Sequence, residues 1–187
     1  RQICCEPRLL YDNILHISSK LEGCLELIRN FQGNNQKVLL FSSFTSMLDL
    51  ISDELEKQQI SYYKLTGATS KEKRHQLVEQ FQNDDTTVFL ISLKAGGTGL
   101  NLTAAEAVIH FDPWWNMSAQ NQATDRAYRI GQKNVVTVYK LVMKNSVEEK
   151  ILELQNKKKN LADTFVENNE GNITSMSTEE IINLFSI

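Results

Sequence analysis

Short apolar runs alternate with amphipathic segments along the chain from residue 37 onward. The runs are rich in Val, Ile, Leu and Phe, a composition typical of strands that are buried on both faces. They predict strands at residues 38–41, 61–65, 88–91, 107–111 and 135–142. Between the first two, apolar side chains recur at helical spacing. This alternation predicts an α/β fold with a mostly parallel sheet covered by helices on both faces.

Polar residues that cap helices mark further helix starts. Thr-Ser-Lys-Glu at residues 69–72 resembles a capping box that opens a helix. A helix rich in Gln and Asn is expected around residues 117–128. Ser-Val-Glu-Glu at residues 146–149 is a second capping box, and the long helix behind it carries one apolar stripe. A last short helix is predicted at residues 181–185, so the chain ends in a helical appendage.

Composition narrows the class of protein. The chain has 187 residues, of which 41% are hydrophobic and 23% charged, which is a globular balance. No apolar run approaches the roughly 20 residues that cross a bilayer, so we expect no contact with a membrane. Three cysteines, two of them adjacent, form neither a disulfide framework nor a CxxC metal site, which favours a reducing, intracellular setting. The histidines also lack metal-ligand spacing, and an opening on Arg1 indicates a fragment of something longer.

Charge is unevenly distributed although the net charge is only −3. Residues 122–160 carry nine basic and four acidic side chains, whereas residues 161–187 carry five acids and no Lys or Arg. The basic stretch includes three consecutive lysines at residues 157–159. These lysines fit either a solvated helix face or a track for DNA.

Ligands of parallel α/β sheets bind in the loops at the carboxyl ends of the strands. The glycine-rich loop at residues 94–101 follows such a strand, and closely spaced glycines let backbone N–H groups approach a phosphate. It is not a dinucleotide fingerprint, because Leu102 stands where the third glycine would be needed. The chain also contains no GxxxxGK[ST] phosphate loop. A plain turn is the alternative interpretation of this loop.

Two other segments carry candidate chemistry. Arg126 and Arg129 are three residues apart, which places them on one helical face, and guanidinium groups match phosphate oxygens well. Surface ion pairs are the alternative role for this pair. Trp114 and Trp115 follow a predicted strand, where they either seal the edge of the core or, at Trp115, stack on nucleic acid.

Five segments, taken in order, closely resemble the second-lobe motifs of the Swi/Snf family of DNA-translocating ATPases, which are superfamily-two helicase relatives. The segments are residues 41–45 (FSSFT), 65–69 (LTGAT), 92–102 (SLKAGGTGLNL), 112–116 (DPWWN) and 122–132 (QATDRAYRIGQ). The sequences of these motifs are most similar to those of bacterial members, which implies a cytoplasmic protein.

The resemblance implies a RecA-like three-layer fold with a mostly parallel central sheet. It divides the chain into the end of an inter-lobe region (residues 1–18), a helicase C-terminal lobe (19–145), and a brace helix with a short terminal helix (146–187). The family's first lobe carries the phosphate loop and an Asp-Glu magnesium motif. We therefore expect ATP and Mg²⁺ to be bound mainly by that missing lobe, with no cofactor on the isolated chain and no activity from it alone.

The resemblance also assigns roles to individual residues. Arg126 and Arg129 would be arginine fingers, which are the catalytic residues of this lobe. The expected nucleotide-site residues are Gln122, Gly97, Gly99 and Asn101. The expected DNA contacts are Ser42, Ser43, Gly67, Lys94, Thr98, Trp115 and Asn116, and no metal ligands are expected. The implied partners are double-stranded DNA and the first lobe of the same protein, while the protein target stays open.

Two alternative functions remain at this point. The lobe alone would serve as a non-catalytic docking or DNA-binding module if no phosphate loop accompanies it in the complete protein. A related RNA helicase lobe is the other alternative, although the tandem tryptophans and the brace-like helix favour the DNA translocase. Stimulation of ATP hydrolysis by duplex DNA, compared with RNA, separates the two.

Overall fold

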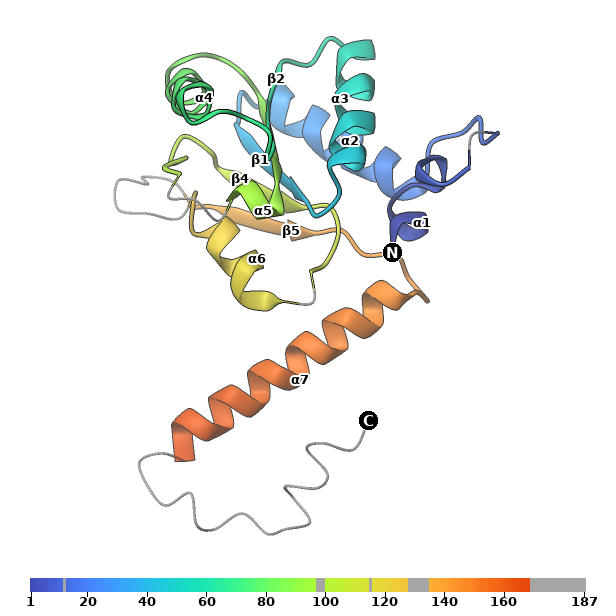
Figure 1. Cartoon of the computed structure of the whole chain (residues 1–187), viewed down its shortest axis with the longest axis vertical. Coiled ribbons are helices and arrows are strands. Elements are labelled where there is room, and N and C mark those ends of the chain that lie inside the picture. Colours follow the sequence, from blue (N-terminus) through green and yellow to red (C-terminus); the bar gives the residue numbers. More distant parts are fainter. Residues whose placement is uncertain (12, 97–99, 115, 128–134, 169–187) are drawn as a thin grey trace. The chain divides into compact units, whose positions relative to one another are not determined.

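The structure is a computed structural model of the chain that describes all residues except 12, 97–99, 115, 128–134 and 169–187 (Figure 1). Its elements in chain order are α1 (Gln2–Cys5), η1 (Pro7–Leu9), α2 (Ser19–Gly33), β1 (Val38–Ser42), α3 (Thr45–Lys57), β2 (Tyr62–Leu65), α4 (Lys71–Asn83), β3 (Val88–Ser92), α5 (Leu93–Gly96), β4 (Ala107–His110), α6 (Met117–Thr124), β5 (Thr137–Lys140) and α7 (Val147–Asn168).

The centre of the fold is a five-stranded sheet with the order β2-β3-β1-β4-β5. Every neighbouring pair is parallel, and Val38 of β1 aligns with Val88 of β3 on one side and with Ala107 of β4 on the other. Because all strands run the same way, each must be connected through a crossover on a face of the sheet. The predicted α/β class with a parallel sheet is confirmed.

Helices cover both faces of this sheet, because side chains of each strand point alternately to opposite sides. Val38 and Leu40 face the layer formed by α2 and α3. Leu39 and Phe41 face the layer that contains α4 and α6 (Figure 1). The central strands β1, β3 and β4 are buried along their whole length, which explains why they read as continuous apolar runs. β5 at the sheet edge is largely exposed.

Some predicted boundaries differ from the structure. The N-cap of α4 is Ser70, whose hydroxyl accepts from the backbone N–H of Lys73, whereas the hydroxyl of Thr69 accepts from Thr66 N in the preceding turn. The predicted helix around residues 117–128 is wrong at its C-terminus, because α6 ends at Thr124. The N–H of Asp125 still donates to the carbonyl four residues back, but those of Arg126 and Ala127 donate to carbonyls three residues back, so the chain continues as a tighter turn.

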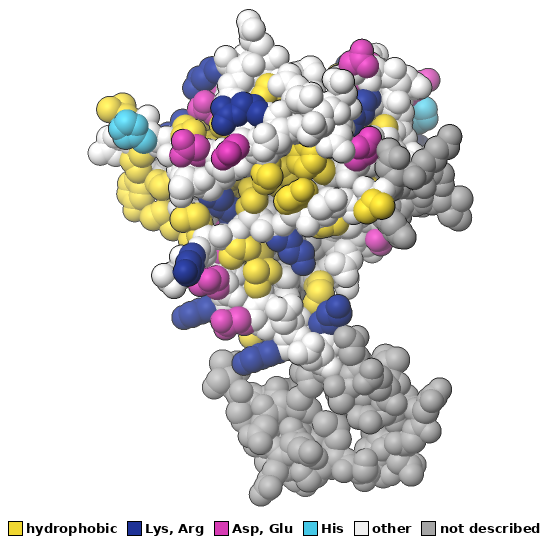
Figure 2. All heavy atoms as spheres, turned by 180° about the vertical axis from the view of Figure 1, so that it is seen from behind, with side chains coloured by type: hydrophobic (Ala, Val, Ile, Leu, Met, Phe, Trp, Pro, Cys, Tyr) yellow, Lys and Arg dark blue, Asp and Glu magenta, His cyan; other side chains and the backbone are white. Residues whose placement is uncertain are grey.

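The N-terminal region contains helical structure that the apolar pattern from residue 37 onward does not cover. Ser18 caps α2 by accepting from Leu21 N, and the buried face of α2 belongs to the core. Glu6 closes the connection between η1 and α2 by accepting from the backbone N–H of Ser18 at 2.9 Å. The connection itself exposes Leu10, Tyr11 and Leu15. Figure 2 shows hydrophobic side chains gathered in patches on the face opposite to that of Figure 1.

The chain divides into two compact units, Arg1–Leu152 and Glu153–Ile187. Within the second unit, the described part of α7 exposes the three consecutive lysines at residues 157–159. The predicted terminal helix at residues 181–185 lies outside the described residues. Among the helices that the structure describes, none combines the length and apolarity of a membrane span.

Candidate functional site

The parallel sheet gathers the candidate loops at one of its edges. The chain leaves β1 at Ser42, β2 at Leu65, β3 at Ser92 and β4 at His110, and parallel strands end on the same side. The predicted contacts after these strands therefore share an edge, as ligand-binding loops do in this fold class.

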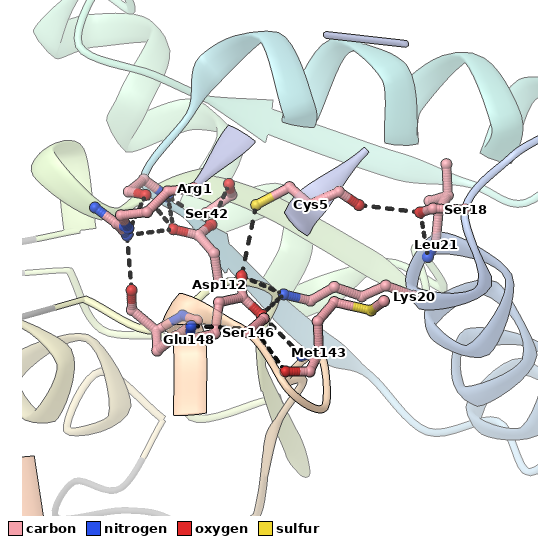
Figure 3. Close-up of polar contacts among 12 residues, drawn as sticks. Arg1, Cys5, Ser18, Lys20, Leu21, Ser42, Asp112, Met143, Ser146 and Glu148 are labelled. Atoms are coloured by element: carbon pink, nitrogen blue, oxygen red, sulfur yellow. Dashed lines mark hydrogen bonds and ion pairs between the residues drawn. The ribbon is translucent and has the colours of Figure 1, made fainter. Parts of the chain in front are cut away.

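The carboxylate of Asp112 organises the middle of this edge (Figure 3). Ser42 Oγ donates to Asp112 Oδ1 at 2.6 Å, and the backbone N–H of Ser43 donates to the same oxygen at 3.1 Å. The hydroxyl of Ser43 donates to Oδ2. The side chain of Asp112 is fully buried, so these donors replace the water that a carboxylate normally binds. The ends of β1 and β4 are thereby held in one arrangement.

Ser42, Ser43 and Asp112 form a corner at the ends of β1 and β4, and Arg1 balances the negative charge of Asp112 there (Figure 3). Its Nη2 lies 3.2 Å from Asp112 Oδ2 and donates to the carbonyl of Pro113 at 2.7 Å. The guanidinium also stands over two aromatic rings, 5.4 Å from the ring centroid of Phe44 and 5.0 Å from that of Trp114. Cation–π contact of this kind stabilises an arginine that is mostly removed from water. Arg1 thus fixes the position of Trp114 beside the serines.

A small cavity of about 60 Å³ opens next to this corner. Its walls are Ser43, Leu93, Lys94 and Trp114. Lys94 is exposed, so its ammonium group is available to a ligand at the mouth of the cavity. Two of the predicted DNA contacts, Ser43 and Lys94, are therefore neighbours in space although 51 residues separate them in the sequence.

Ser42, by contrast, points inward. The residue is 1% exposed, and its hydroxyl hydrogen is used by Asp112. A direct contact between Ser42 and DNA would require this hydrogen bond to break. In the structure, the Ser42 hydroxyl supports the corner that presents Ser43.

The turn after α6 carries the described member of the arginine pair. The side chain of Arg126 donates from Nε to the carbonyl of Gln122 at 3.0 Å. Its backbone carbonyl accepts from Leu102 N at 3.0 Å, which joins this turn to the end of the glycine-rich loop. Ala123 and Ala127 near it are buried in the core, whereas Arg126 is half-buried. Arg126 thus extends from a turn, and Arg129 lies outside the described residues.

The end of the glycine-rich loop is held by α4. Gln82 donates from Nε2 to the carbonyl of Asn101 and to Thr103 Oγ1, both at 3.2 Å, and its Oε1 accepts from Ala104 N at 2.7 Å. One side-chain amide thus satisfies three groups of an irregular segment. The fixed segment continues into Leu102, which binds the Arg126 turn.

A second, larger cavity of about 670 Å³ lies between α4 and this loop. Its basic wall consists of Lys71, Arg74 and His75. The predicted nucleotide residue Asn101 also lines this cavity. The Arg74 guanidinium donates to the carbonyl of Ala95 in α5 at 3.1 Å, so this arginine also helps to hold the loop.

Comparison with known proteins identifies this arrangement. Residues 19–131 match the family described as helicase conserved C-terminal domain. The chain belongs to this helicase family. It is 41% identical over 195 residues to the putative ATP-dependent helicase/translocase YwqA of Bacillus subtilis, covering 100% of this chain and 21% of that protein. A putative SWI/SNF-related regulator of chromatin from Arabidopsis thaliana is 41% identical over 176 residues, covering 91% of this chain and 20% of that protein.

A solved structure agrees with these relatives. The C-terminal part of the Fun30 ATPase domain is 37% identical, superposes with a TM-score of 0.72, and covers 82% of this chain and 52% of that one. The fold is therefore the RecA-like α/β fold of a helicase C-terminal lobe, and the resemblance to the Swi/Snf family is confirmed. The chain spans about a fifth of the length of the curated relatives it matches.

Three further predicted residues lie on described parts of this helicase lobe. Gly67 is exposed in the turn after β2, and Gln122 is exposed on α6. The side chain of Asn116 accepts from Ser118 N at 3.0 Å and thereby caps the N-terminus of α6. The other predicted site residues lie outside the described part of the chain, namely Gly97, Thr98, Gly99, Trp115 and Arg129.

Sequence reasoning missed residues that organise the lobe. Asp112 directly follows a strand of apolar residues, which is a usable signal for a buried carboxylate at a strand end. Gln82 gives no such signal, because an amide on an amphipathic helix normally faces solvent. Arg1 lies far from the predicted site in the sequence, so its contact depends on how the N-terminal segment folds back.

The acids of this edge do not suit a magnesium ion. Both carboxylate oxygens of Asp112 already accept hydrogen bonds, and Arg1 balances its charge. Among the described residues, no group of three His, Cys, Asp or Glu side chains comes together as a metal site. We therefore derive no step in which this lobe holds the metal.

Proposed function

We propose that this chain is the second motor lobe of an ATP-dependent translocase that moves along double-stranded DNA and remodels nucleoprotein. The lobe supplies Arg126 and Arg129 to ATP that is held by the first lobe of the same protein. It also supplies contacts to the DNA backbone from the carboxyl-end edge of its sheet. The isolated lobe, which lacks the phosphate loop, is inactive in this proposal.

The observation that carries the proposal is the hydrogen bond between Leu102 N and the carbonyl of Arg126. It joins the glycine-rich loop to the turn from which the arginine extends. The same loop begins at Lys94, which shares a cavity with Ser43 at the proposed DNA edge. In this proposal, DNA contact near Lys94 and the position of the Arg126 turn are coupled through this loop.

The proposed chemistry of the arginines is electrostatic. When ATP draws the two lobes together, the guanidinium groups approach the γ-phosphate and stabilise the charge that develops as the terminal phosphoryl group transfers to water. A well-placed arginine of this kind accelerates hydrolysis by roughly 10³- to 10⁵-fold. Hydrolysis then removes the group that the arginines hold, and the lobes separate.

The proposed DNA contacts are independent of sequence. The Lys94 ammonium and the backbone at Gly67 are donors suited to phosphate oxygens, and phosphates carry no base identity. The Ser43 hydroxyl, like that of Ser42, would first have to release the carboxylate of Asp112. A translocase must pass over every sequence, so backbone contacts suit its task. YwqA, the Bacillus relative, bears the name helicase/translocase.

Replacement of the arginines in the complete protein tests the catalytic part. Arg126→Ala and Arg129→Ala are each expected to lower DNA-stimulated ATP hydrolysis at least 100-fold while ATP binding is kept, because the first lobe holds the nucleotide. Arg29→Ala, which removes an exposed arginine from α2, is the matched control and should hydrolyse ATP normally. Arginine variants that keep more than a tenth of the normal rate would contradict the finger role and favour a docking module.

Salt dependence tests the DNA part. Lys94→Ala should weaken binding of duplex DNA equally for unrelated sequences and should reduce the slope of log K against log salt by about 0.9, the loss of one phosphate contact. Lys57→Ala on α3 is the control, since that lysine pairs with Glu54 and lies outside the predicted site. An unchanged slope for Lys94→Ala would remove it from the DNA site, and stronger stimulation of hydrolysis by RNA would favour an RNA helicase.

A further inference from the structure

His110, the last residue of β4, makes a contact that neither the sequence motifs nor the proposed chemistry uses. Its side chain is almost completely buried, with 2% of the residue exposed. The Nε2 atom lies 2.9 Å from the hydroxyl of Thr124, the last residue of α6. This pair therefore joins a central strand of the sheet directly to the end of the helix that precedes Arg126.

The ring of His110 has a fixed position. It stacks on Phe41, its partner in the register of β1 and β4, with ring centroids 5.6 Å apart and an interplanar angle of 24°. Burial, with a smaller effect of the Lys140 charge, lowers the pKa of His110 to about 4. The imidazole is therefore neutral near pH 7, and one of its nitrogens carries the hydrogen.

The hydrogen bonds around Thr124 define which nitrogen this is. The Thr124 hydroxyl donates to the carbonyl of Gln120 at 3.3 Å, which uses its single hydrogen. We take the hydroxyl to accept from His110, which assigns the imidazole hydrogen to Nε2. The result is a series of two hydrogen bonds, in which the His110 imidazole donates to the Thr124 hydroxyl and the hydroxyl donates to the carbonyl of Gln120 in α6.

Among the described residues, this hydrogen-bonded series and a second hydrogen bond both hold the Arg126 turn. Thr124 is fixed to β4 through His110, and two residues later the carbonyl of Arg126 accepts from Leu102 N. The first connection ties the C-terminus of α6 to β4. The second fixes the turn against the glycine-rich loop. Arg126 extends from the short segment between these connections.

We propose that His110 is a positioning residue for the arginine site, acting through the hydroxyl of Thr124 on the end of α6. This inference rests on the proposed role of Arg126. His110 itself contacts neither ATP nor DNA in this scheme. Small displacements of a catalytic group reduce rate strongly, so loss of the connection should act on turnover more than on nucleotide binding.

The experiment uses the complete protein and variants of similar size. Thr124→Val replaces the hydroxyl by a methyl group, and Thr124→Ser keeps the hydroxyl. Thr124→Val is expected to lower kcat of DNA-stimulated ATP hydrolysis about tenfold with KM for ATP changed less than twofold. Thr124→Ser should keep at least half of the normal kcat. Thermal melting of both variants shows whether the fold is retained.

Variants of His110 test the same hydrogen bond from its other side, so the conclusion does not depend on whether Thr124→Val folds correctly. His110→Phe keeps the stacking on Phe41 and removes the donor, whereas His110→Gln restores an amide N–H near the position of Nε2. We expect His110→Phe to lose kcat about as much as Thr124→Val, the Phe/Val double variant to lose no more than either one, and His110→Gln to recover most of the loss. A purely structural role would lower the melting temperature and leave kcat of the folded enzyme unchanged.

Arg126→Ala, measured beside these variants, separates the two levels of the proposal. If Arg126→Ala abolishes turnover and Thr124→Val and His110→Phe keep a normal kcat, the positioning role is wrong and the arginine role stands. If Arg126→Ala itself keeps a normal kcat, the arginine role is wrong and the positioning role falls with it. Losses in kcat that are additive in the double variant would also overturn the connection between His110 and Thr124.

Discussion

Lys20 and Glu148 form a buried ion pair although 128 positions separate them in the sequence. The ammonium of Lys20 lies 2.8 and 2.7 Å from the two carboxylate oxygens, and the side chains are 2% and 1% exposed (Figure 3). Glu148 also accepts from Met143 N, and Lys20 lies 5.2 Å from the ring centroid of Phe111. The pair thus fastens the first turn of α7 to α2, next to the strand end that presents Asp112.

Removal of one partner of this pair should destabilise the lobe strongly. Lys20→Met leaves the Glu148 carboxylate buried without its cation, which typically costs about 3–5 kcal/mol of unfolding free energy. Lys57→Met is the matched control, because that lysine pairs with Glu54 at the surface and such pairs contribute at most about 1 kcal/mol. Urea denaturation at pH 7 measures both variants.

The double variant Lys20→Met with Glu148→Leu separates charge burial from packing. It should recover most of the loss, because two apolar side chains of similar volume leave no unpaired buried charge. A double variant that is no more stable than Lys20→Met would show that the polar contacts of Glu148 to Met143 N and to Cys5, rather than charge pairing, dominate.

Stability should depend on pH through His110. The pKa of this group is lowered from its usual 6.5 to about 4 in the folded lobe, mainly by burial. Between pH 4 and pH 6.5 the His110 imidazole is protonated in the unfolded chain but stays neutral in the folded chain. The contribution of neutral His110 to the unfolding free energy is therefore complete above about pH 6.5. It is lost as the pH falls toward 4, and it amounts to about 3 kcal/mol in all.

His110→Gln removes this titration while keeping an N–H donor. Between pH 7 and pH 4 the variant is expected to lose about 3 kcal/mol less stability than the natural protein. Urea denaturation at several pH values gives the comparison, and the carboxylates titrate equally in both proteins. Parallel stability curves would mean that His110 already binds its proton in the folded state near neutral pH.

The strands, though not their order in the sheet, were accessible from the sequence for a physical reason. A strand buried on both faces must be apolar at every position, so residues 38–41 and 88–91 stand out from their surroundings. The edge where the site lies follows from this alone, since parallel strands end together. The end of α6 was not accessible, because the helical pattern continues past Thr124 while the backbone of Arg126 and Ala127 tightens into a turn.

The candidate site was predicted unevenly for a similar reason. The pairing of Ser43 with Lys94 at one cavity follows from two adjacent strand ends, β1 and β3. The burial of Ser42 behind that corner was hidden, because a serine has the same sequence signal whether its hydroxyl meets water or a carboxylate such as Asp112. Long-range contacts of this kind leave no local pattern.

Neutralising Asp112 should loosen the corner that presents Ser43. Asp112→Asn keeps the shape but replaces one acceptor oxygen with an amide that itself donates, so at least one of the serine donors or Arg1 loses its partner. We expect a loss of about 2–3 kcal/mol in unfolding free energy. Asp53→Asn on the exposed face of α3 is the control and should change it by less than about 0.5 kcal/mol. Equal stability of the two variants in urea would show that the corner does not depend on the charge of Asp112.

Gly67 offers a test of DNA binding that leaves the fold alone. A Cβ added at this position meets no atom within 4 Å, so packing does not explain a glycine there. Gly67→Ala should therefore keep or slightly raise the melting temperature. If DNA approaches the backbone at this turn, as we propose, the added methyl group should weaken duplex binding several-fold, because it holds the phosphate away from the N–H groups.

Gly33→Ala is the matched control, since a Cβ at the end of α2 also meets nothing within 4 Å but lies at the opposite edge of the sheet. Titration of fluorescent duplex DNA with the complete protein measures both variants, and equal affinities would remove Gly67 from the DNA path while leaving Lys94 and Ser43 untouched.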